Sequence, residues 1–65
     1  MKIEVIMTAK ESRKVYELEV STAKEAQRIA DMVANDIAKM SDESYTVLLD
    51  GKEYAKIVQR KITVL

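Results

Sequence analysis

Acidic side chains gather in two short stretches, and carboxylate oxygens are the ligands that hard cations prefer. Asp42 and Glu43 follow a predicted helix, whereas Asp50 and Glu53 flank a predicted turn. Neither stretch has the alternating aspartates of a calcium-binding loop, and the single glycine excludes a glycine-rich phosphate loop. The chain also lacks cysteine and histidine, the usual ligands of zinc, copper and haem iron. We therefore expect no metal and no cofactor.

Serine is the remaining residue type that could act as a nucleophile. The serines all fall in predicted loops or caps: Ser12, Ser21, Ser41 and Ser44. Without histidine, only a lysine could serve as the base that activates a serine hydroxyl. No such pair is evident in the sequence, so we expect a protein that is not an enzyme.

Basic residues are concentrated near the C-terminus, at Lys52, Lys56, Arg60 and Lys61. On a helical interpretation of this segment, three of them share one exposed face that could contact phosphates. The whole chain, however, balances eleven basic against eleven acidic residues. Because no overall field attracts a polyanion, nucleic-acid binding through these four residues is the alternative hypothesis rather than the preferred one.

The length of 65 residues predicts one domain spanning residues 1–65. A chain of this size buries only about 60% of the surface that its unfolded form exposes, so association with another copy would stabilise it. Its apolar runs are too short to span a bilayer, and no apolar segment resembles a signal peptide. We expect a cytoplasmic protein with no membrane contact.

Residues 22–40 carry the clearest structural pattern, that of an amphipathic helix. Thr22 and Glu25 have the spacing of a capping box at its start. The helical period predicts one apolar stripe, with Ala23 and Ala34 at its edge, formed by Ala26, Ile29, Ala30, Val33, Ile37 and Met40.

Alternating apolar and polar residues predict strands over 2–8 and 14–20. Pairing the apolar faces gives one register, with Met7 opposite Tyr16, Val5 opposite Leu18 and Ile3 opposite Val20. This register permits a loop of two or four residues, and we favour four, over residues 10–13. It also sets Glu4 opposite Glu19, a like-charge pair that Lys2 partly offsets.

A third strand is predicted over 45–49, followed by Asp50-Gly51, a strong hairpin signal that sets Val47 opposite Tyr54. Continued strand alternation after the turn would place Lys56 and Arg60 on the core face, unless a bulge near residues 57–58 corrects it. The competing interpretation is a short helix over residues 51–60. We favour the hairpin because the β-branched tail over 62–64 suits the end of a long strand.

The preferred architecture is therefore an α+β fold in the order ββαββ, a four-stranded sheet with one central amphipathic helix packed on one face. The alternative is ββαβαβ, with a short second helix at about 51–60. The preferred order resembles the β-grasp arrangement of small immunoglobulin-binding domains, in which the first and last strands lie side by side at the centre. No residue motif accompanies this resemblance, so it implies nothing about function.

Some apolar residues have no predicted partner within the chain. Met32 lies on the polar side of the helix, and the sheet face that the helix cannot cover carries Ile6, Val15, Leu48 and Ile57. We expect these residues to contact a protein partner, most simply a second copy in a homodimer. The expected function is a protein–protein interaction module of accessory, inhibitor or adaptor type, such as a phage or mobile-element protein. Besides nucleic-acid binding, the remaining alternative is a designed scaffold without biological function.

Overall fold

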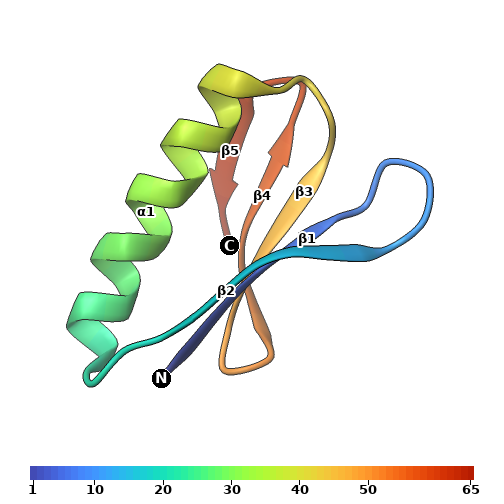
Figure 1. The fold of residues 1–65 in the computed structure, drawn as a ribbon. Helices are drawn as coiled ribbons and strands as arrows, with labels where there is room; N and C mark the ends of the chain where they lie inside the picture. The colour runs from blue at the N-terminus through green and yellow to red at the C-terminus, as the bar shows by residue number, and fades with distance from the viewer.

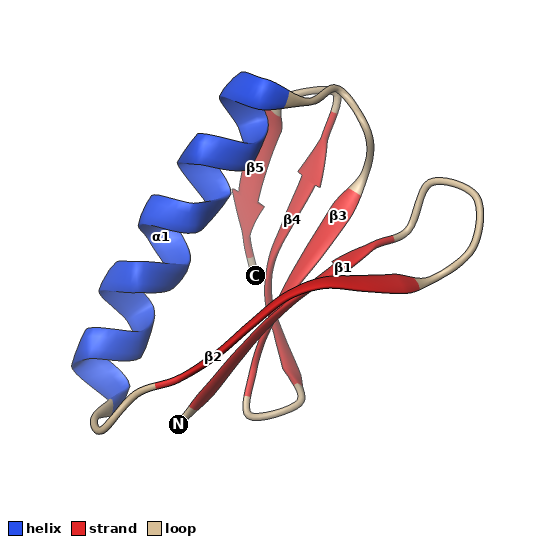
Figure 2. Ribbon diagram, in the orientation of Figure 1, coloured by secondary structure: helices blue, strands red, loops and turns tan.

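The chain forms one helix and one antiparallel sheet in the computed structural model, which describes residues 1–65 (Figure 1). The α+β class with a single helix is confirmed, and α1 covers part of one sheet face (Figure 2). The sheet has five strands rather than four, in the order β2-β1-β3-β4-β5. The elements are β1 (Lys2–Met7), β2 (Arg13–Glu19), α1 (Ala23–Met40), β3 (Tyr45–Leu49), β4 (Lys52–Val58) and β5 (Lys61–Val64).

The fifth strand exists because the chain turns back at Gln59 and Arg60. Both residues adopt left-handed backbone conformations, with φ of 49° and 65°, and Val58 pairs with Lys61 across them. The prediction of one long strand with a bulge near residues 57–58 is therefore wrong, and so is the alternative helix over 51–60. Glutamine and arginine give no turn signal, since such turns normally contain glycine or asparagine.

The hairpin at Asp50 and Gly51 is confirmed, with φ of 51° and 80°. Val47 pairs with Ala55 rather than with Tyr54, because a bulge between Val47 and Leu48 leaves Tyr54 without a partner on β3. Asp50 also fixes this turn to β1. Its Oδ1 accepts a hydrogen bond from the backbone N–H of Lys2 at 2.7 Å, and its own N–H donates to the Lys2 carbonyl at 2.9 Å.

The first hairpin forms as predicted, but in a different register. Val5 lies opposite Tyr16, and Glu4 lies opposite Glu17 instead of Glu19. The register shifts between Val5 and Ile6, which leaves Val15 as an extra residue on β2. The loop between the strands therefore covers residues 8–12, one more than expected.

The strand order differs from the β-grasp arrangement. β1 lies between β2 and β3, and the last strand, β5, forms an edge of the sheet. Tight turns at residues 50–51 and 59–60 make β3, β4 and β5 a meander, so each strand stays beside the one before it. The central place next to β1 is taken by β3, and the resemblance does not extend to topology.

Alanine forms the contact between α1 and the sheet. The buried helix residues recur at every fourth position: Ala26, Ala30, Ala34 and Ala38. Ile29, Val33 and Ile37 are half-buried and pack against this core, whereas Met40 is 80% exposed, so the predicted stripe is wrong at Met40. Small side chains allow a close approach to the buried strand residues Ile3, Val5, Val47 and Ile57.

The ends of α1 match the sequence. Thr22 caps the helix, since its Oγ1 accepts a hydrogen bond from the backbone N–H of Glu25 at 3.2 Å. Ser41 ends it in an extended conformation. This helix does not combine the length and the apolar character that are needed to cross a lipid bilayer.

The Gln59-Arg60 turn should be a site where glycine stabilises the fold. Arg60→Gly removes a left-handed arginine, whose backbone costs about 1 kcal/mol, and loses only an exposed 3.4 Å hydrogen bond to the Lys39 carbonyl. We expect a gain of about 1 kcal/mol in the free energy of unfolding, measured by urea denaturation. Gly51→Ala is the control in the opposite direction, because a Cβ there meets no atom within 4 Å and only the backbone is strained. Equal stability of both variants would contradict this account.

Helix substitutions should distinguish the observed contact from the predicted stripe. Ala30→Leu inserts volume where α1 is fully buried, so we expect a loss of about 1–3 kcal/mol in the free energy of unfolding. Met40→Ala should change it by less than about 0.5 kcal/mol, since Met40 is exposed. A larger effect at Met40 than at Ala30 would mean that the helix is rotated relative to this arrangement.

Candidate functional site

The expected interface residues lie in three separate places. Ile6 and Leu48 are half-buried on the sheet face away from the helix, and Val15 is 46% exposed at the bulge of the edge strand β2. Met32 is 56% exposed on the solvent side of α1. Ile57 is fully buried in the core, so its predicted place on the outer face is wrong. The bulge that leaves Tyr54 without a partner on β3 is the reason, because it shifts the alternation of β4 by one residue. Ile57 therefore pairs with Tyr45 on the core side, and Val58, 52% exposed, faces outward.

The outer face beside β2 is polar. The Lys14 Nζ lies 2.9 Å from the Glu4 carboxylate and 2.6 Å from that of Glu17, while the Lys2 Nζ lies 3.8 Å from Glu17. The hydrogen bond from Lys14 lowers the pKa of Glu17. The hydrogen bonds to Glu17 and then Glu4 raise the pKa of Lys14. These ion pairs offset the repulsion between the carboxylates of Glu4 and Glu17.

The helix approaches β1, β3, β4 and β5, and two hydrogen bonds join it to the part of the chain far from β2. The Tyr54 hydroxyl donates a hydrogen bond to Asp31 Oδ1 at 2.7 Å, and the Arg60 guanidinium donates to the Lys39 carbonyl at 3.4 Å. Both contacts join α1 to β4 and the turn that follows it. In contrast, no Cα atom of α1 lies within 8 Å of a Cα atom of β2. The helix side of β2 is consequently uncovered.

We call this uncovered surface the open face. Its strand side carries Tyr16, which is half-buried, and Leu18, which is 37% exposed. Its helix side carries the flank of α1 opposite to Asp31. The open face therefore comprises, beside Arg13 of β2, the apolar or aromatic residues Met7, Tyr16, Leu18, Ile29, Val33 and Ile37. Tyr16, Ile29, Val33 and Ile37 also pack against the buried core with part of their surface.

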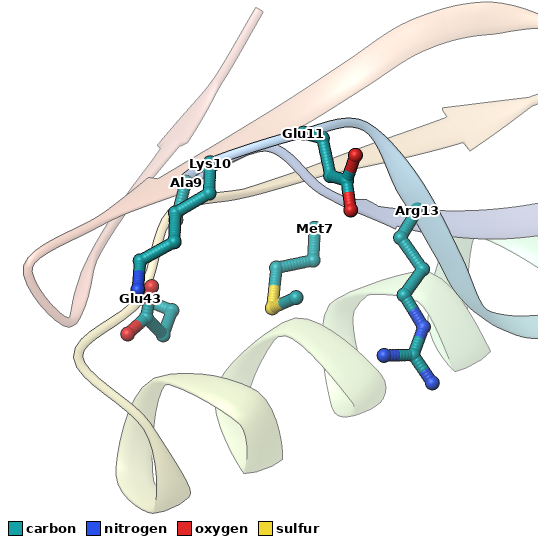
Figure 3. A pocket seen from close by; sticks show the side chains of 6 residues that line it. All are labelled: Met7, Ala9, Lys10, Glu11, Arg13 and Glu43. Carbon is teal, nitrogen blue, oxygen red and sulfur yellow. The ribbon is translucent and has the colours of Figure 1, made fainter.

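A shallow hollow of about 290 Å³ lies at the loop end of the open face. Met7 reaches into it from β1, and Arg13 extends from β2 toward the helix side (Figure 3). Its rim is charged, and the lining residues are Met7, Ala9, Lys10, Glu11, Arg13 and Glu43. No cluster of three acidic side chains could hold a metal ion, and no buried side-chain polar atom lacks a hydrogen-bond partner. The hollow thus offers an apolar base with a mixed-charge rim, which suits contact with a polypeptide more than chemistry.

The basic residues of the alternative hypothesis are not brought together. Lys52 begins β4 beside the Asp50-Gly51 turn, whereas Arg60 and Lys61 lie at the other end of that strand. Lys56 lies between them, with its Nζ 4.0 Å from the Glu53 carboxylate. A continuous phosphate-binding strip is not formed, so nucleic-acid binding stays a prediction without geometric support.

Sequence reasoning missed the open face because it assigned Tyr16, Leu18 and the helix flank to the core. The only signal that could have found it was the width of the sheet. α1 approaches β1, β3, β4 and β5 but not β2, the fifth strand at the edge of the sheet. Recognising the fifth strand would therefore have implied uncovered apolar residues.

The contribution of the Tyr54–Asp31 hydrogen bond to stability can be tested by varying the pH. The hydrogen bond that the Tyr54 hydroxyl donates to the Asp31 carboxylate raises the pKa of Tyr54. This bond therefore stabilises the fold fully below the ordinary tyrosine pKa of about 10, and the stabilisation is lost as pH rises through the raised pKa. We expect the free energy of unfolding to fall above about pH 10, with a component that Tyr54→Phe removes. Tyr16→Phe is the control and should keep this component. An identical alkaline profile for Tyr54→Phe and the original protein would contradict the assignment.

Comparison of the chain with protein-family models, with curated proteins and with solved structures finds no match. Any function proposed for it therefore rests on its own residues and their geometry.

Proposed function

We propose that this protein is a small non-enzymatic protein–protein interaction module that self-associates through the open face. The observation that carries the proposal is the apolar surface left beside β2, where the sheet extends beyond its only helix. An apolar surface at a sheet edge is typical of a contact with another chain.

The small core supports the same conclusion. Nine residues are buried, and four of them are helix alanines that contribute little apolar area. Large side chains remain exposed elsewhere, including Val15, Leu18, Met32 and Val58. Association would remove part of this area from water and stabilise a fold that has little interior. The accessory, inhibitor or adaptor role, of a phage or mobile-element kind, and the cytoplasmic location belong to this proposal.

Molar mass by light scattering over a concentration series tests self-association. We expect a dimer for the original protein and a monomer for Leu18→Lys, because an ammonium group on the open face would have to be desolvated in the contact. Met32→Lys is the control of similar chemistry on the solvent side of α1 and should stay dimeric. Circular dichroism checks that each variant is folded.

A third variant distinguishes the two faces of the sheet. Leu48→Lys lies on the outer face and should leave the dimer intact. Dissociation by Leu48→Lys but not by Leu18→Lys would move the contact to the outer face. A monomeric mass for the original protein at every concentration would refute the proposed self-association.

A further inference from the structure

We propose that two copies join by antiparallel pairing of their β2 edges, in the single register that sets Lys14 of each copy opposite Glu17 of the other. This inference rests on the proposed self-association. It names the strand, the register and the charges that would specify the contact.

The choice of β2 follows from the two edges of the sheet. An edge strand presents unpaired backbone N–H and C=O groups that can pair with another strand. β5 offers only four residues, whereas β2 has seven, of which all but Tyr16 are exposed. No helix backbone approaches β2. β2 is therefore the longer of the two edges, and no helix covers it.

The bulge at Val15 restricts how two β2 strands can pair. Lys14 lies on the outer face, where it contacts Glu4 and Glu17, while Tyr16 packs against the core on the helix side. The extra residue between them reverses the alternation of faces. Beyond the bulge, Glu17 and Glu19 point outward and Leu18 points to the helix side. Opposed residues of an antiparallel pair must share a face, so most registers are excluded.

The bulge displaces Val15, so the faces of the other β2 residues decide which symmetric registers are possible. Registers centred on Lys14, Glu17 or Glu19 set that residue against its own copy in the partner, and a register centred on Leu18 sets Glu17 against the partner's Glu19. Like charges directly opposite each other destabilise all four. Another register is centred between Val15 and Tyr16, and it pairs Lys14 of each copy with Glu17 of the other. Only this register brings opposite charges together.

The same register also brings apolar side chains of the two copies together. The two bulges meet at equivalent positions, so neither strand has a surplus residue between its charged pairs. Arg13 then lies beside the partner's Leu18, and the Tyr16 side chains of both copies adjoin on the helix side. Two five-stranded sheets become one continuous sheet, and the strand parts of the two open faces merge between the helices.

Charge exchange tests this register directly. Lys14→Glu alone creates two like-charge pairs across the interface, as does Glu17→Lys alone, so each variant should dimerise about tenfold more weakly. An equimolar mixture of the two variants places opposite charges at both positions and should restore dimerisation as a heterodimer, detected by native mass spectrometry. The double variant Lys14→Glu with Glu17→Lys also restores both pairs and should dimerise like the original protein.

Lys56→Glu on β4 is the control for a change of net charge and should leave the dissociation constant unchanged. If both single variants dimerise as strongly as the original protein, the β2 register is refuted while self-association stands. If they weaken but the mixture does not recover, the proposed opposition of Lys14 and Glu17 is refuted. If the original protein is monomeric throughout, both proposals fail together.

Discussion

The structure depends on the close contact between the alanines of α1 and the sheet. Because Ala26, Ala30, Ala34 and Ala38 carry only a methyl group, the helix backbone lies near the strands that hold Ile3, Val5, Val47 and Ile57. The core is therefore thin, and its apolar area comes mainly from the sheet. A thin core leaves little stability in reserve, so every surface that folding leaves uncovered matters more than it would in a larger domain.

The helix approaches four strands, β1, β3, β4 and β5, and leaves β2 at the far edge uncovered. The Tyr54 hydroxyl and the Arg60 guanidinium donate hydrogen bonds to the Asp31 and Lys39 side of α1, which joins the helix to β4 and to the turn that follows it. The half-exposure of Ile29, Val33 and Ile37 is a consequence of this placement rather than a separate feature of the sequence.

At the β2 edge, charged and apolar side chains contribute to a contact in different ways. Exposed ion pairs such as Lys14–Glu17 contribute little to stability by themselves, but opposed like charges can exclude a register. Burial of apolar surface would supply most of the affinity of a contact there, and the charges would select its geometry. The bulge at Val15 strengthens this selection, because it fixes which residues of β2 share a face.

The sequence by itself determined the elements whose signals are local: the capped helix from Thr22, the hairpin at Asp50-Gly51, and the strands with alternating side chains. It could not place the turn at Gln59-Arg60, because neither residue favours a positive φ and only pairing of β5 with β4 compensates for the strain. Nor could it place Ile57, the bulges, the strand order or the rotation of α1, since periodicity specifies that a face is buried but not against what. Tertiary packing decided these points, and with them it decided that Tyr16 and Leu18, which the alternation assigned to the core, lie on a face that the helix does not cover.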